Sequence, residues 1–214
     1  MKYKILAGFL SLLSIGNLYA QETEKNLEPI QENGKSLYVK GNALLLPVGI
    51  LNAGLEYQLG KKYTLQGDVF ISPWKSFAGH EFQYYSISLE GRYYFDEAFK
   101  HWYLGANLSA ASFVLQKWNY WGNGTYTNDR NEKFKKSNLY QKGLSVIVGV
   151  TAGYQFQLSE NWNLDVYATV GTSQDYYKGY DRTTGKRYDI AREYNKSGEV
   201  LPYRGGIMIS YKIK

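Results

Sequence analysis

The sequence contains no cysteine, which excludes disulfide bonds and metal sites built on thiolates. Histidine is scarce as well, with 2 residues in 214, so chemistry that depends on imidazole has few candidates. Phosphate-binding loops, glycine-rich dinucleotide turns and clusters of metal ligands are also missing from the sequence. We therefore expect neither a cofactor nor a metal site.

Aromatic residues, in contrast, are abundant: they make up 17 % of the chain and include 22 Tyr. Such residues suit the pleated surface of a β-sheet, and the 22 Gly indicate curved strands or close backbone approach. The length is that of one domain with a sizeable core. The net charge is +6, but the basic residues are spread along the chain and no nucleic-acid module is recognisable. We expect no nucleic-acid partner.

The N-terminus has the pattern of a secretory signal. Two lysines precede a short apolar run at 5–15, and Ala20 is a small residue suited to a cleavage site. The alternative, a short anchor helix, is less favoured because a bilayer span needs about 20 apolar residues. We predict a signal peptide at 1–20, a flexible polar lead-in at 21–36 and a domain at 37–214.

Segments in which apolar and polar residues alternate, bounded by turn residues, recur eight times after residue 37. Most have at least the roughly 9–11 residues that a tilted strand needs to cross a bilayer. A typical soluble strand is nearer about 5–6 residues. The predicted strands are Leu37–Leu46, Leu51–Leu59, Tyr63–Trp74, Phe82–Phe95, Trp102–Trp118, Gly143–Leu158, Trp162–Tyr177 and Tyr203–Ile213.

The connections between these segments differ in length on the two sides. Short turns at 60–62, 96–100 and 159–161 follow the second, fourth and sixth segments, and long polar loops at 119–142 and 178–202 follow the fifth and seventh. Short periplasmic turns and long outward loops are typical of outer-membrane barrels. The sequence predicts an all-β, eight-stranded, antiparallel up-and-down transmembrane β-barrel in the bacterial outer membrane. The connection after the first segment is an exception, since it is short on the outward side.

Each predicted strand has one face of large apolar residues and one of small, polar and charged residues. Eight strands enclose only enough space for side chains, so we expect lipid outside and a salt-bridged plug inside. An ion path through the lumen, and a soluble secreted barrel binding an apolar ligand, remain as alternatives. For Arg92 the expected partners are Glu56, Asp68 or Glu90. The predicted lumen charges are Lys40, Glu56, Asp68, Glu90, Arg92, Asp165 and Lys212.

A lipid A-modifying enzyme is the alternative with chemistry of its own. His80, Glu81 and Ser76 could in principle form a catalytic group in the outward loop before the fourth strand. Adjacent residues on a strand point apart, however, so His80 and Glu81 are poorly placed to cooperate. We expect no catalytic residues.

The long loops mix aromatic with basic residues, a composition enriched in binding surfaces. Their positive charge favours lipopolysaccharide phosphates or acidic glycans, and a protein ligand is a further candidate. The alternative is a solvated loop with a basic tip. We expect a structural or adhesin-like role, with outer-membrane lipid and lipopolysaccharide as partners. The predicted loop residues are Trp121, Tyr126, Lys133, Lys135, Lys136, Arg182 and Arg187.

Several short motifs carry a resemblance to a known family. "KGN" at 40–42, "GLEY" at 54–57, "PW" at 73–74, "RYYF" at 92–95 and the run at 149–171 resemble a family of small outer-membrane β-barrel proteins of unknown function from Bacteroidota. Asp165 stands where that family usually has Glu, and the last strand follows the family only loosely. The resemblance covers about 37–213. It implies an outer-membrane barrel and brings no known activity.

Overall fold

The structure, a computed structural model, describes residues 35–191 and 193–214. The predicted signal peptide, and all but the last two residues of the predicted lead-in, lie outside the described residues. Among the residues that are described, no helix is both long enough and apolar enough to cross a membrane.

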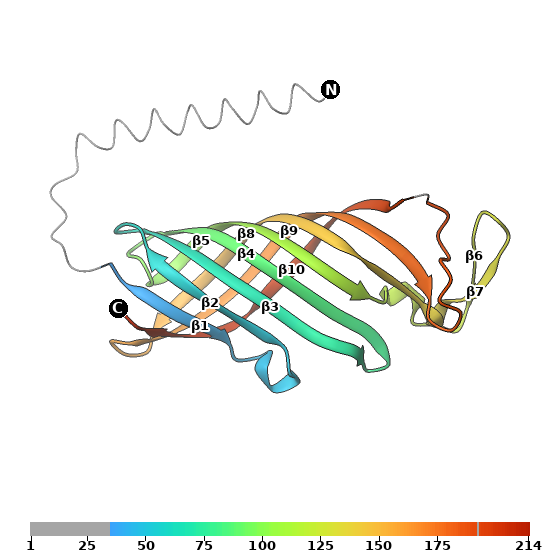
Figure 1. Ribbon diagram of the computed structural model, residues 1–214. Helices are drawn as coiled ribbons and strands as arrows, with labels where there is room; N and C mark the ends of the chain where they lie inside the picture. The colour runs from blue at the N-terminus through green and yellow to red at the C-terminus, as the bar shows by residue number, and fades with distance from the viewer. Residues whose placement is uncertain (1–34, 192) are drawn as a thin grey trace, which may run out of the picture. The chain divides into compact units, whose positions relative to one another are not determined.

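Eight long or medium strands form the domain, and they follow the eight segments in which apolar and polar residues alternate (Figure 1). The prediction of eight strands is confirmed. Their bounds are β1 Leu37–Asn42, β2 Leu51–Gln58, β3 Tyr63–Phe77, β4 His80–Tyr94, β5 His101–Leu115, β8 Leu139–Gln157, β9 Trp162–Asp181 and β10 Asn195–Lys212.

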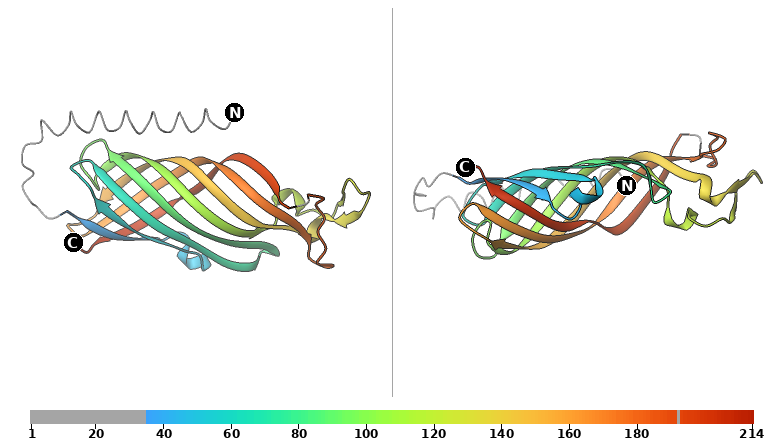
Figure 2. Two further views of the ribbon diagram at one scale, coloured as in Figure 1. Left: turned by 45° about the horizontal axis from the view of Figure 1, so that its top comes forward. Right: turned by 90° about the horizontal axis from the view of Figure 1, so that it is seen from below.

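The strands close into a ring in the order β1-β10-β9-β8-β5-β4-β3-β2, and every neighbouring pair is antiparallel (Figure 2). Apart from the hairpin described next, strands adjacent in the sequence are adjacent in the ring, and β10 returns to β1. The prediction of an antiparallel up-and-down arrangement is therefore confirmed.

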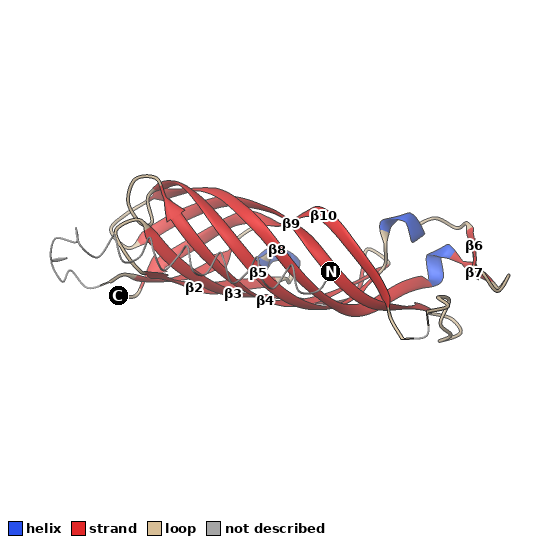
Figure 3. Ribbon diagram, turned by 90° about the horizontal axis from the view of Figure 1, so that it is seen from above, coloured by secondary structure: helices blue, strands red, loops and turns tan. Residues whose placement is uncertain are grey.

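Short elements lie in the connections on the side of the long loops (Figure 3). A small hairpin, β6 Thr125–Thr127 with β7 Lys133–Lys135, stands between β5 and β8. The remaining elements are the 3-10 helices η1 Leu46–Val48, η2 Trp118–Tyr120 and η3 Lys136–Asn138.

Several strands run further toward the long loops than the sequence predicted. β8 and β9 have 19 and 20 residues, so the connections that remain are 116–138 and 182–194. β3 and β4 meet in a two-residue turn at Ala78 and Gly79, both with positive φ (51° and 87°), as a type I′ hairpin needs. His80 is consequently the first residue of β4, and its predicted position in a loop is wrong.

β1 and β2 are much shorter than the other strands, with 6 and 8 residues (Figure 1). β1 pairs with β10 only between Met208 and Lys212, and β2 pairs with β3 only up to Ile71. Beyond these points, residues 195–206 of β10 and 72–77 of β3 pair on one edge only within the described chain. The ring is thus closed by strand pairing in its short-turn half, and it is incomplete near the long loops.

Candidate functional site: the ion-paired lumen and the loops

The inner face of the ring holds a cluster of fully buried charges. The Lys40 ammonium lies 2.7 Å from Glu56 Oε2 and 2.6 Å from Asp165 Oδ2. Arg92 Nη1 lies 3.1 Å from the same Glu56 oxygen and 2.9 Å from the same Asp165 oxygen, and Arg92 Nε lies 2.6 Å from Glu90 Oε1. Because buried ions need partners at close range, this reciprocal pairing is what makes their burial possible.

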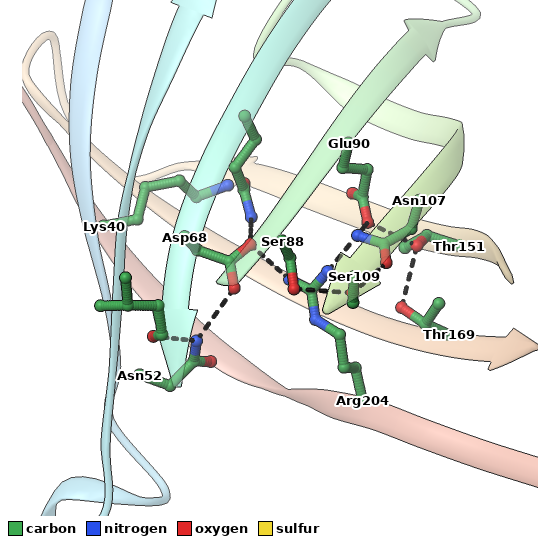
Figure 4. A network of polar contacts seen from close by, with 12 residues as sticks. Lys40, Asn52, Asp68, Ser88, Glu90, Asn107, Ser109, Thr151, Thr169 and Arg204 are labelled. Atoms are coloured by element: carbon green, nitrogen blue, oxygen red, sulfur yellow. Dashed lines mark hydrogen bonds and ion pairs between the residues drawn. The ribbon is translucent and has the colours of Figure 1, made fainter. Parts of the chain in front are cut away.

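Arg204 extends the cluster by way of Asp68 and Glu90 (Figure 4). Its Nη2 lies 2.6 Å from Asp68 Oδ2 and its Nη1 lies 3.5 Å from Glu90 Oε2. With Lys40 and Arg92 this gives three cations against four carboxylates. Sequence reasoning missed Arg204, although it lies six residues before the inward Ser210 and alternation therefore places both side chains on the inner face of β10.

The predicted lumen charges divide into two groups. Lys40, Glu56, Asp68, Glu90, Arg92 and Asp165 are brought together in the network. Lys212 is not: it is only half-buried near the end of β10, and it makes no ion pair with any described residue. Of the partners expected for Arg92, Glu56 and Glu90 pair with it, whereas Asp68 pairs with Arg204 and Asp165 takes its place.

Buried tyrosines fill the space around the charges. The Tyr94 hydroxyl lies 2.8 Å from Glu56 Oε1, and the Tyr103 hydroxyl donates to Asp165 Oδ1 at 2.9 Å. The Arg92 guanidinium lies over the Tyr103 ring, 4.4 Å from its centroid. Gly153 leaves room for that ring, because a Cβ there would lie 2.4 Å from it. The lumen at this level is therefore packed with side chains.

A second set of polar contacts continues through the middle of the lumen (Figure 4). Thr151 donates to Glu90 Oε2 at 2.7 Å and lies 2.8 Å from the Thr169 hydroxyl. Ser88 and Ser109 lie within 2.8 Å of each other, and Ser109 donates to Asn107 Oδ1 at 2.7 Å. These small residues occupy the inward positions that alternation predicted.

The outer face of the ring has the opposite character. Its side chains are large and apolar on every strand, and many are strongly exposed, such as Ile87 at 64 % and Val150 at 68 %. Aromatic residues lie on this face near the short turns, where Trp162 and Tyr211 contact each other with ring centroids 4.8 Å apart. An apolar exterior and a charged interior are the reverse of a soluble barrel.

The two long connections pack against each other through an aromatic cluster. Tyr188 is almost fully buried among Tyr120, Tyr126 and Phe134, with ring centroids 5.4–6.3 Å from its own. Gln141 Nε2 donates to the Tyr188 hydroxyl at 3.2 Å. The cluster therefore ties both connections to the end of β8.

The predicted loop residues fall into three kinds of environment. Tyr126 belongs to the aromatic cluster, while Arg182 pairs with Glu81 at 2.6 Å and Arg187 pairs with Asp189. Trp121 is exposed and stacks on His80, with centroids 4.2 Å apart. The remaining predicted residues are Lys133 and Lys135, which are exposed on β7, and Lys136, which is half-buried. None of these three lysines makes an ion pair within the described chain.

His80 and Glu81 have separate partners. His80 Nδ1 lies 2.6 Å from Gln116 Oε1, and Glu81 accepts from Arg182. No hydrogen bond joins His80 to Glu81 or Ser76 in the described part of the chain. The described residues also contain no group of three or more His, Cys, Asp or Glu side chains that could hold a metal ion.

The loop carboxylate Asp189 has a pKa below its usual value. Burial acts to raise this pKa, but the hydrogen bonds donated by Arg187 and by the Gly179 N–H, the latter at 2.6 Å, outweigh it. The ionised Asp189 therefore stabilises the loop at any pH above the pKa that this carboxyl has in the unfolded chain. The stabilisation is lost as the pH falls through the lower pKa that it has in the folded chain.

We expect acidification to loosen the 182–194 connection while the barrel stays folded. Amide protection factors across that connection, which are corrected for the intrinsic pH dependence of exchange, should fall below about pH 4, the ordinary range of an Asp carboxyl. The Asp189→Asn variant should already have low protection factors at neutral pH, and they should change little on acidification. Equal pH dependence in the variant and the parent chain would show that another group controls the loop.

The fold and the site define a class: an all-β protein whose eight antiparallel strands form a closed ring around an ion-paired interior. The model of the family described as "Protein of unknown function (DUF3575)" matches residues 23–213. The chain therefore belongs to this family. Neither a curated protein nor a solved structure matches it significantly.

Proposed function

We propose that the protein is a small bacterial outer-membrane β-barrel, exported through its N-terminal signal, with a surface-interaction role carried by its long loops. One observation carries the proposal: charges are buried inside the ring while large apolar side chains cover the outside. In water, so much exposed apolar surface is unfavourable at about 25 cal/mol per Å². In a bilayer the same surface is matched by lipid.

The direction of insertion follows from the connections. The connections 60–62, 96–100 and 159–161 are all short and lie at one end of the ring, and both long connections, 116–138 and 182–194, lie at the other end, together with the 43–50 connection and the two-residue turn between β3 and β4. Long loops of outer-membrane barrels face outward. Exposed Trp102, Trp162 and Tyr211 near the short turns suit the periplasmic aromatic girdle. The motif resemblance to small outer-membrane barrels of Bacteroidota supports the proposed location in the outer membrane.

The surface role rests on Lys133 and Lys135, which project from β7 at the loop end and make no ion pair within the described chain. Exposed Trp118 and Trp121 lie in the same connection. Cations beside flat aromatic rings favour an anionic partner, such as a lipopolysaccharide phosphate or an acidic glycan. No intrinsic chemistry is proposed, since His80 and Glu81 are engaged separately.

Cell fractionation combined with electrophoresis tests the membrane location. Folded protein should be recovered in the outer-membrane fraction and should migrate differently in SDS with and without heating. Recovery of the folded chain in the periplasm or the medium would instead favour the soluble alternative.

Replacing Lys133 and Lys135 together by Gln should weaken binding to anionic lipopolysaccharide vesicles about 30-fold, because each lysine near an anionic surface contributes about 1 kcal/mol. Point changes are preferable to loop deletion, since the hairpin also carries Tyr126 and Phe134 of the aromatic cluster. The matched control is Lys61→Gln in a short turn, at the opposite end. Unchanged binding in the double variant would remove the loops from the proposed function.

A further inference from the structure

The half of the lumen nearest the long loops is not filled like the rest. It contains a cavity of about 470 Å³, walled mainly by apolar and aromatic side chains. Its walls include Phe70, Phe82, Tyr84, Phe113, Leu115 and Tyr177. The volume falls in the range of about 300–1,000 Å³ that is usual for small-molecule sites, and such sites are mostly apolar.

Tyr203 forms the floor of this cavity together with Arg204, whose charge is paired with Asp68 and Glu90. The Tyr203 hydroxyl crosses the lumen to donate to Asn107 Oδ1 at 2.6 Å. Its ring lies over two glycines, since a Cβ on Gly149 or Gly171 would lie 2.8 Å or 2.7 Å from it. A β-bulge between Pro202 and Arg204 leaves Tyr203 without a pairing partner, so Tyr203 and Arg204 can both point inward.

One acidic group on the cavity wall has no cationic partner. Asp175 accepts hydrogen bonds from Ser145 at 2.5 Å, Ser173 at 2.8 Å and Ser197 at 3.3 Å. It makes no ion pair with a described residue, whereas Glu199 on the same wall lies 3.7 Å from the Lys117 ammonium. Three hydroxyls hold the Asp175 carboxylate in place, and its charge remains available to a cation in the cavity.

A second hollow of about 270 Å³ lies beside the cavity, where the ring is incomplete. It shares Phe70, Pro202, Tyr203 and Arg204 with the first and reaches Leu45, in the connection after β1. The strand edges near it are the unpaired residues 195–206 of β10 and 72–77 of β3. Each edge contains a proline, Pro202 or Pro73, as edge strands tolerate.

The rim of this side opening is apolar. The connection after β1 reads "ALLLPVGI" at 43–50, and its Leu44, Leu46 and Val48 are exposed. Water-facing loops are rarely so apolar, whereas exposed apolar patches of this kind mark contact with lipid or with a ligand. Val200, in the segment of β10 that pairs on one edge only, is 79 % exposed.

From these features we infer that the cavity binds a lipophilic small molecule carrying a protonated amine, which enters from the bilayer through the opening between β10 and β3. The apolar part contacts the aromatic walls, and the ammonium pairs with Asp175. The entry route rests on the proposed membrane location, while the binding site itself does not.

Binding can be measured with dansylcadaverine, a fluorescent lipophilic amine, on the barrel in phosphatidylcholine nanodiscs. Trp118 and Trp121 line the cavity and should transfer energy to the bound dansyl group. We expect saturable transfer at one probe per barrel, weakened at least about tenfold by Asp175→Asn, since hydrogen bonds to charged groups are the strong ones. The matched control is Asp129→Asn, an exposed loop carboxylate outside the cavity lining.

A second probe that lacks the terminal amine separates charge recognition from folding defects. This neutral analogue should bind the parent chain and the Asp175→Asn variant equally. Absence of saturable transfer in the parent chain, or an amine preference that Asp175→Asn leaves intact, would overturn the binding site. Heat-modifiable migration of each variant checks its folding.

The entry route has its own test, because the chain contains no cysteine and a single thiol is unique. The Ser197→Cys variant places that thiol on the β10 edge of the cavity. Each thiol is labelled with pyrenylmaleimide dissolved in the bilayer and, separately, with a sulfonated water-soluble maleimide, and the ratio of the two labelling rates is compared. This ratio should be at least about tenfold higher for Ser197→Cys than for the exposed loop variant Thr184→Cys. Equal ratios would refute lateral entry. Failure of the barrel to insert into vesicles would refute the membrane proposal instead, and probe binding could then still be measured in solution.

Discussion

Arg92→Ala should destabilise the barrel by about 3–5 kcal/mol, the usual cost of removing one partner of a buried ion pair. The reason is the number of carboxylates that depend on this residue. Arg92 contacts Glu56, Glu90 and Asp165, and all four side chains are fully buried. Lys40 still pairs with two of the carboxylates, but among the described residues Glu90 would keep only one cationic partner, Arg204, at 3.5 Å. The midpoint of urea unfolding in detergent measures the loss.

Lys212→Ala is the matched control for Arg92→Ala. Lys212 also points toward the lumen side of its strand, but it is half-buried and makes no ion pair with a described residue. Its removal should change stability by less than about 0.5 kcal/mol, as for most surface substitutions. Equal stability of Arg92→Ala and the parent chain would show that water enters the lumen and stabilises the orphaned carboxylates. That outcome would favour an ion path, and planar-bilayer recording of the parent chain would then show a steady conductance rather than none.

The number of strands and the side on which each residue lies could be predicted because alternation with period two is a local property of the sequence. Inward Glu56 and Glu90 and outward Leu55 and Leu89 follow directly from it. The exact pairing partners could not be predicted, because the inner face brings together residues far apart in the sequence, such as Asp68 and Arg204, which are 136 positions apart.

Departures from alternation account for most of what the sequence did not reveal. After Asn42 the chain is apolar at every position, so the predicted first strand extended too far, whereas the observed β1 ends there. At Pro202–Arg204 a bulge interrupts the alternation along β10, which hid the inward position of Tyr203; Arg204 follows the alternation and could have been predicted. Both departures border the side opening and the cavity.

The loop residues were harder to place for a different reason. Composition identified aromatic and basic residues, but composition does not distinguish a residue that packs from one that is free. Tyr126 packs against Tyr188, and Arg182 pairs with Glu81, while Lys133 remains exposed. Only the three-dimensional packing of 116–138 against 182–194 separates these roles.

Val148→Arg should disfavour membrane insertion by about 2–4 kcal/mol, the cost of a cation on the lipid face near the bilayer midplane. Val148 is outward and exposed, and it pairs with Leu108 on β5 and Thr172 on β9, well inside both strands. Insertion of urea-unfolded protein into phosphatidylcholine vesicles, followed by heat-modifiable migration, measures the change. The inward neighbour Thr151 is unsuitable as a control, because it is buried and bonded to Glu90 and Thr169, and an arginine there would overfill the lumen.

Thr184→Arg supplies the control, since Thr184 is exposed in the connection between β9 and β10. An arginine there should leave insertion unchanged within about 0.5 kcal/mol. The comparison separates two environments for the apolar exterior. If the exterior contacts lipid, only Val148→Arg is penalised. If it contacts water, an arginine replaces an exposed valine at little cost, both variants fold equally well, and the membrane location is wrong.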